Sequence, residues 1–159
     1  MKAPGRHFLM ISGILYTLFF TLMLVSFSLI ALVIFQSGLS TTELASVMVA
    51  DLGYDFLPYV DMLFSFFTVV MVAGFALSII GLIFGILAIA LRNKLKAALF
   101  LFILGMFSLV MDAITLVFVL FSGDLFGIIF SSVLFLLPLF YVIGAGLNRR
   151  AYKKQLKNG

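Results

Sequence analysis

The chain has 159 residues, of which 65% are hydrophobic and 10% are charged, with a mean hydropathy of +1.34 and a formal net charge of +4. Soluble domains are about a quarter charged and about half apolar, and a core of this size cannot bury so much apolar surface. The composition therefore excludes a soluble enzyme or a nucleic-acid-binding protein, despite an isoelectric point near 9.6, and predicts an integral membrane protein.

Four apolar stretches are long enough to cross a bilayer as helices, which takes about 20 residues each. They cover residues 8–35, 62–91, 97–121 and 125–147. The remaining sizeable segments are an outer loop at 36–61 and a basic tail at 148–159. This arrangement predicts an all-α fold, in which residues 1–159 form a single transmembrane domain built as a four-helix bundle.

The outer loop contains one segment with a helical pattern. Ser40 and Glu43 have the spacing of a capping box, and apolar residues then recur at helical intervals. We expect a short amphipathic helix on the outer leaflet. It either packs over the bundle as a lid or spacer, or docks a partner protein. The candidate docking residues are Leu44, Met48, Tyr54, Asp55 and Tyr59.

Small residues follow one face of the second span, and the glycines among them are Gly74, Gly81 and Gly85. The third span has a similar stripe that includes Gly105. Small residues let membrane helices approach closely. Because residues 92–96 form a short turn, the two spans are expected to make an antiparallel hairpin with the stripes facing each other. A homodimer face is the alternative interpretation.

Asp112 is the only formally charged residue within the four spans. A carboxylate at membrane depth is costly, so it marks a functional hypothesis by default. The spans contain no Lys, Arg or His, and the expected partners are therefore the hydroxyls of Ser78, Ser108 and Thr115. Asp112 is either a neutral acid that donates a hydrogen bond between helices or a site of proton or cation coupling.

The distribution of basic residues predicts the orientation. All ten Lys and Arg residues lie at the amino end, between the second and third spans, or in the tail. The positive-inside rule therefore places both termini in the cytoplasm of a multi-pass plasma-membrane protein. The tail is expected to be attracted to anionic lipid headgroups.

Residues for catalysis are scarce. The chain has no Cys and one His, His7, so it lacks the ligands of a structural zinc site and a thiolate nucleophile. Asp112 has no second carboxylate at its depth and no base beside it within the spans. The sequence therefore predicts no enzyme activity, no metal and no cofactor.

Three segments carry a resemblance to a family: FLMISGILYTL after the basic start, IIGLIFGILAIALRNKLKAAL across the second turn, and VIGAGLNRR at the end of the last span. The chain resembles an uncharacterised family of small four-span membrane proteins of Gram-positive bacteria. That resemblance implies a bacterial plasma membrane, no catalysis, and a role beside transporters or envelope-stress systems.

Two functions follow as hypotheses. The first is a non-catalytic membrane protein that acts through protein or lipid contacts as an accessory, regulatory or immunity-type subunit, with the bilayer, a membrane protein or a second copy as partner and no nucleic acid. The alternative is an oligomeric small transporter or channel subunit in which Asp112 couples protons or cations.

Overall fold

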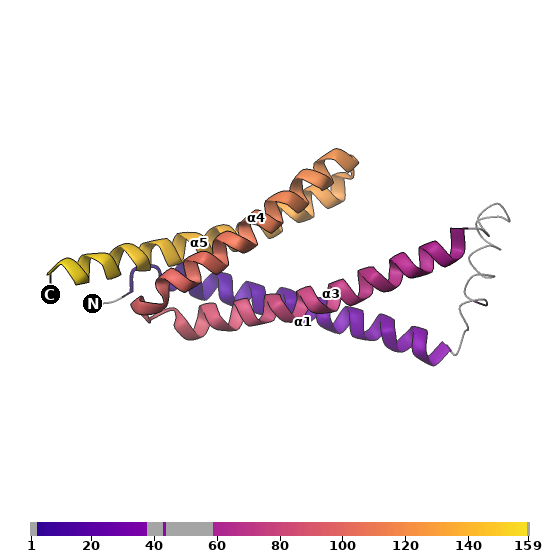
Figure 1. Cartoon of the computed structure of the whole chain (residues 1–159), viewed down its shortest axis with the longest axis horizontal. Coiled ribbons are helices and arrows are strands. Elements are labelled where there is room, and N and C mark those ends of the chain that lie inside the picture. The colour runs from indigo at the N-terminus through magenta and orange to yellow at the C-terminus, as the bar shows by residue number, and fades with distance from the viewer. Residues whose placement is uncertain (1–2, 38–42, 44–58, 159) are drawn as a thin grey trace. The chain divides into compact units, whose positions relative to one another are not determined.

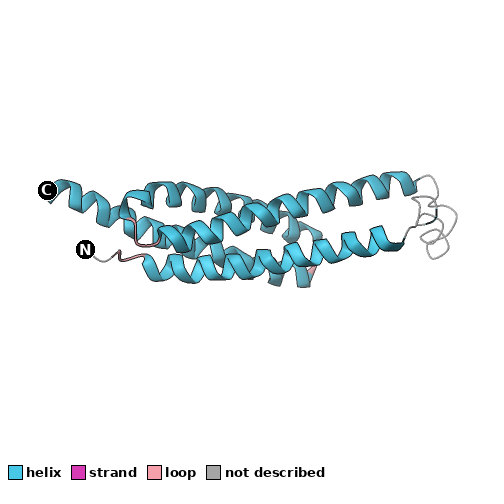
Figure 2. Cartoon of the chain, turned by 90° about the horizontal axis from the view of Figure 1, so that it is seen from below, coloured by secondary structure: helices cyan, strands magenta, loops and turns pink. Residues whose placement is uncertain are grey.

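The computed structural model describes residues 3–37, 43 and 59–158 (Figure 1). Its elements in chain order are α1 (Arg6–Ser37), α3 (Val60–Leu91), the short 3-10 helix η2 (Leu95–Ala97), α4 (Ala98–Ser122) and α5 (Leu125–Asn158). Figure 2 shows that the described part of the chain is helical with short loops and has no strand. Four helices are long and apolar enough to cross a membrane, which confirms the all-α prediction and its four long apolar segments.

The last helix is longer than its predicted span. The apolar run ends at Leu147, whereas α5 continues through the basic tail to Asn158. Ala, Leu, Lys and Gln favour helix, and the tail contains neither Pro nor Gly before Gly159. The helix therefore carries the tail cations in a defined order on its surface.

The chain divides into two compact units, and the division falls inside α1 and α3. The first unit comprises the described parts of residues 1–19 and 81–159, and the second comprises those of 20–80. In the first unit α4 and α5 lie side by side as an antiparallel pair (Figure 1). Each unit is described separately below.

The turn between α4 and α5 has a clear chemical cause. Gly123 has φ of +70°, the left-handed conformation that ends helices and that glycine adopts without strain. Asp124 then caps α5, because its carboxylate oxygens accept hydrogen bonds from the main-chain N–H groups of Phe126 (3.1 Å) and Gly127 (3.0 Å). This pair of residues fixes where one helix stops and the next begins.

At the other end of the first unit, the side chain of Asn148 joins three segments of chain. Its Oδ1 accepts a hydrogen bond from the main-chain N–H of Gly5 (2.7 Å), and its Nδ2 donates to the carbonyl of Arg92 (3.0 Å). Asn148 is fully buried. Both halves of the amide are thus used to hold the start of α1 and the end of α3 against α5.

Two further contacts hold α1 against α5. A Cβ added at Gly5 would overlap the carbonyl of Gly144, so these two backbones touch directly. Farther along, the Ser12 hydroxyl donates a 2.8 Å hydrogen bond to the carbonyl of Leu137, next to Pro138 inside α5. The Ser12 hydrogen bond therefore adds a polar contact between α1 and α5 beside this proline.

In the second unit, α1 and α3 meet through aromatic packing. A Cβ at Gly74 would overlap the ring of Phe27, which lies 5.9 Å, centroid to centroid, from the ring of Phe75. The absence of a side chain at Gly74 thus leaves the space that the Phe27 ring fills. This contact sets how closely the two helices pack in this unit.

Candidate functional site

The first unit contains a polar cluster within its apolar helices. The hydroxyls of Tyr16 on α1 and Ser108 on α4 are joined by a 2.6 Å hydrogen bond. Tyr16 is only 2% exposed. This hydrogen bond stabilises the buried phenol, because burying an unpaired hydroxyl costs free energy.

Tyr141 brings α5 into the same cluster. Its ring meets that of Tyr16 edge to face, with centroids 6.1 Å apart and planes at 82°, which is a favoured aromatic geometry. The Tyr141 hydroxyl is buried and has no hydrogen-bond partner among the described residues. Gly105 on α4 makes room for this ring, since a Cβ there would lie 2.8 Å from Cδ1 of Tyr141.

Asp112 completes what we call the Tyr16 cluster: Tyr16, Ser108, Asp112 and Tyr141. Asp112 follows Ser108 by four residues on α4, so both side chains lie on the same face of that helix. Its carboxyl is half-buried and interacts electrostatically with Tyr16. A carboxyl, two phenols and a hydroxyl are therefore gathered from three helices.

The three hydroxyls expected to accompany Asp112 have different surroundings. Ser108 belongs to the cluster, where it pairs with Tyr16. The hydroxyl of Thr115 donates to the carbonyl of Met111 in its own helix (3.0 Å). Ser78 belongs to the second unit, and its hydroxyl donates to the carbonyl of Gly74, also in its own helix (2.7 Å).

Neither tyrosine was a candidate from sequence. The sequence does contain a signal for them, because both are phenols inside otherwise apolar runs. A phenol hydroxyl in such a run favours a polar partner. Asp112 drew attention because it is charged at neutral pH. Tyr16 and Tyr141 carry the remaining polar groups, and they belong to two other helices, α1 and α5.

Three of the predicted packing glycines, Gly74, Gly85 and Gly105, have close neighbours on another helix. A Cβ at Gly85 would be 2.5 Å from Oγ1 of Thr17 and 2.9 Å from the carbonyl oxygen of Gly13, both on α1. Gly105 faces α5, as described above, and Gly74 faces Phe27. Gly81 is buried. The nearest neighbours of Gly85 and Gly105 are thus α1 and α5, rather than each other's helices.

The expected docking segment falls almost entirely outside the described residues. Leu44, Met48, Tyr54 and Asp55 are not described by the structure. Tyr59, which immediately precedes α3, is 54% exposed.

No protein-family model, curated protein or solved structure matches this chain. Its function must therefore be argued from its own residues. Within residues 3–37, 43 and 59–158, no group of three His, Cys, Asp or Glu side chains has the arrangement of a metal site. Within the Tyr16 cluster, Tyr16 is joined to Ser108 by a hydrogen bond and to Tyr141 by ring packing, and these contacts are suited to holding three helices together.

Proposed function

We propose that the chain is a four-span membrane protein of the bacterial plasma membrane that acts without catalysis, as an accessory, regulatory or immunity-type subunit working through protein or lipid contacts. The observation that supports this best is how the interior polar groups are used. Ser12, Asn148 and the Tyr16–Ser108 pair all hydrogen-bond between helices of the first unit. Hydrogen bonds between helices stabilise a bundle. The outer surface of the bundle is then available for contact with partners.

Membrane insertion is supported by the outward-facing side chains. Phe118, Phe121 and Phe126 near the α4–α5 turn are 73%, 87% and 77% exposed, and most other exposed side chains on the long helices are Leu, Ile, Val and Phe. Such a surface is stable in lipid and unstable in water. The basic residues support an arrangement with both termini and the α3–α4 turn in the cytoplasm.

Labelling of single cysteines tests this topology, because the natural chain has no Cys to remove. We expect Asn93→Cys and Gln155→Cys to be protected from a membrane-impermeant maleimide in intact cells. Ser122→Cys, at the exposed end of α4, should react under the same conditions. Labelling of all three positions from outside, or extraction of the protein by alkaline carbonate, would contradict the proposed insertion.

A candidate contact face lies in the second unit. Residues of α1 and α3 line an apolar groove of about 310 Å³ whose only hydroxyl, on Thr68, already donates to the carbonyl of Phe64 (2.9 Å). The groove is therefore apolar throughout and fits an apolar helix. We propose a membrane-embedded helix of a partner protein as its occupant.

Two valines of α3 provide a matched test of this contact. Val72 lines the groove and Val69 does not, and they are 65% and 66% exposed. A photo-crosslinking amino acid at Val72 should give one discrete protein adduct in membranes, and the same group at Val69 should give lipid adducts. Equal patterns at both positions would contradict a partner helix in the groove.

The Tyr16 cluster supports a second candidate function, an oligomeric transporter or channel subunit coupled through Asp112. The supporting observation is a half-buried carboxyl that interacts with a phenol at membrane depth. Proton and cation flux into proteoliposomes tests it, with Asp112→Asn compared against Asp124→Asn. Both substitutions remove one negative charge from the chain. Flux that Asp112→Asn alone abolishes would favour this function over the first.

A further inference from the structure

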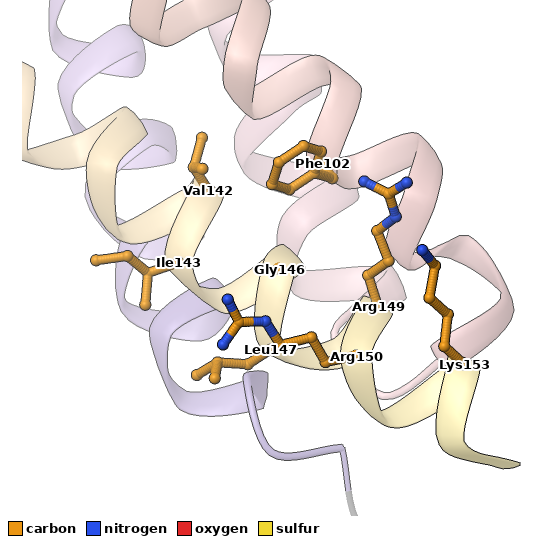
Figure 3. Close-up of a pocket in the computed structure, with 8 residues that line it drawn as sticks. All are labelled: Phe102, Val142, Ile143, Gly146, Leu147, Arg149, Arg150 and Lys153. Carbon is orange, nitrogen blue, oxygen red and sulfur yellow. The ribbon is translucent and has the colours of Figure 1, made fainter.

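A pocket of about 540 Å³ lies between α4 and α5 near the end of the bundle that carries the basic tail (Figure 3). Gly146 lies at its centre, Phe102 of α4 forms one wall, and Arg149, Arg150 and Lys153 of α5 line its polar side. No acidic residue lines it. The pocket therefore has a positive charge that its own lining does not neutralise.

The position of one cation is set by an aromatic contact. The guanidinium carbon of Arg149 lies 5.3 Å from the centroid of the Phe102 ring, within the range of a cation–π interaction. This contact joins α5 to α4 and holds the guanidinium at the pocket wall. In Figure 3 the Arg149 and Lys153 side chains extend along one side of the pocket and that of Arg150 along the other. Gly146 lies between them.

The pocket changes from apolar to cationic along α5. Val142, Ile143 and Leu147 line its apolar part, and the three cations follow toward the carboxyl end of the helix. From Val142 to Lys153 this gradient extends about 16 Å at about 1.5 Å per residue. Its polarity matches that of an amphiphile with an anionic head and an apolar chain.

Gly146 leaves space at the junction of the two parts. A Cβ added there would meet only the Phe102 ring, at 3.6 Å, which is an ordinary van der Waals distance. A larger side chain would extend into the pocket. This position therefore allows the pocket to be filled without altering any charge.

We propose that this pocket binds one acidic phospholipid. Arg149, Arg150 and Lys153 hold its phosphate, and an acyl chain lies along Val142, Ile143 and Phe102. Arginine suits the phosphate because its planar guanidinium donates two parallel hydrogen bonds to phosphate oxygens. This inference rests on the membrane insertion proposed above, and it adds a specific binding site to a general attraction between the tail and anionic headgroups.

Native mass spectrometry of the purified protein, titrated with defined lipids in detergent, tests the site. We expect one phosphatidylglycerol to bind more tightly than phosphatidylcholine. The double variant Arg149→Gln/Arg150→Gln should weaken this binding on the order of tenfold or more, because it removes charge-assisted hydrogen bonds. The control is Lys154→Gln/Lys157→Gln, which removes the same charge from exposed positions of α5 outside the pocket. It should change the affinity by less than about twofold.

A third variant separates shape from charge. Gly146→Leu retains every cation and places a side chain in the pocket, so it should also lower phosphatidylglycerol occupancy. Equal losses in the two charge variants, with no effect of Gly146→Leu, would overturn the proposal in favour of diffuse attraction. Competition by inorganic phosphate at the concentration of the lipid would overturn it in favour of a free-anion site. Failure of membrane insertion is detected separately by carbonate extraction.

Discussion

The hydroxyls of Tyr16 and Ser108 lie 2.6 Å apart, although 92 positions separate these residues in the chain. This hydrogen bond joins the first helix to the third long helix of the described chain inside an apolar unit. It brings Tyr16 beside Asp112 and gives the first unit a polar centre.

We expect the Tyr16–Ser108 bond to contribute measurably to stability. A double-mutant cycle of Tyr16→Phe and Ser108→Ala, measured by reversible unfolding in mixed micelles, should give a coupling free energy of about 0.5–1.5 kcal/mol. Both single variants destabilise, since each removes this hydrogen bond. Additive effects of the two substitutions would show that the hydroxyls do not interact in the membrane.

Tyr141→Phe provides a contrasting prediction. The Tyr141 hydroxyl is buried and lacks a hydrogen-bond partner among the described residues, so its removal relieves an unsatisfied polar group. We expect the free energy of unfolding to stay the same or rise, while Tyr16→Phe lowers it. A loss as large as that of Tyr16→Phe would mean that the Tyr141 hydroxyl binds a water molecule or another ligand.

Replacing Asn148 should destabilise the bundle. Asn148→Ala leaves the N–H of Gly5 and the carbonyl of Arg92 without their partner in a buried location, at a cost of about 2 kcal/mol or more. Asn93→Ala is the control, because Asn93 is exposed in the α3–α4 turn. Thermal unfolding in detergent should separate the two variants, and equal midpoints would contradict the role given to Asn148.

Two glycines of α5, two residues apart, should respond oppositely to alanine. A Cβ at Gly144 would lie 2.9 Å from the carbonyl oxygen of Gly5 and from the main-chain nitrogen of Leu9, so Gly144→Ala must push α1 away. We expect a loss of about 1–3 kcal/mol in the free energy of unfolding. Gly146→Ala meets only an ordinary contact and should be neutral or slightly stabilising, because alanine favours helix. Equal effects would argue against the α1–α5 contact.

The cap of α5 gives a local prediction. Asp124→Ala removes the acceptor of the Phe126 and Gly127 amides, at about 1 kcal/mol, or roughly a fivefold loss of protection against hydrogen exchange at those two amides. Asp124→Asn retains one acceptor oxygen and should preserve protection at one of the two amides. Loss of protection throughout α4 and α5 in the alanine variant would show that the cap supports the whole hairpin instead.

The helices are predictable from sequence, because a helix suited to face lipid is a long apolar run. Such a run is recognised without any knowledge of tertiary contacts. Sequence reasoning singled out Asp112 for a similar reason, since a formal charge in such a run is conspicuous. It did not identify the partners of Asp112. Tyr16 meets Ser108 of α4 and Tyr141 of α5 only because three helices pack together, and the order of helices around a bundle is not encoded in any one segment.

The small-residue stripes illustrate the same limit. The spacing of Gly74, Gly81 and Gly85 predicts a close helix contact, but the pattern does not say which helix approaches. The short turn at residues 92–96 favoured the next span as the partner. The structure instead places Gly85 against Gly13 and Thr17, because a helix hairpin leaves each helix free to use another face for its closest contact.

The Gly5–Asn148 hydrogen bond has a consequence for how the chain is made. The two residues are 143 positions apart, and a ribosome adds about 5–20 residues per second, so on the order of 10 s passes between their synthesis. During that interval Ser12 and Tyr16 have been made, while Leu137 and, at first, Ser108 have not. Under the proposed membrane insertion, the first helix would therefore enter the bilayer before Ser108 and Leu137 have been made. Under the same proposal, the first helix is most exposed to insertases, chaperones and proteases until the last helix has left the ribosome.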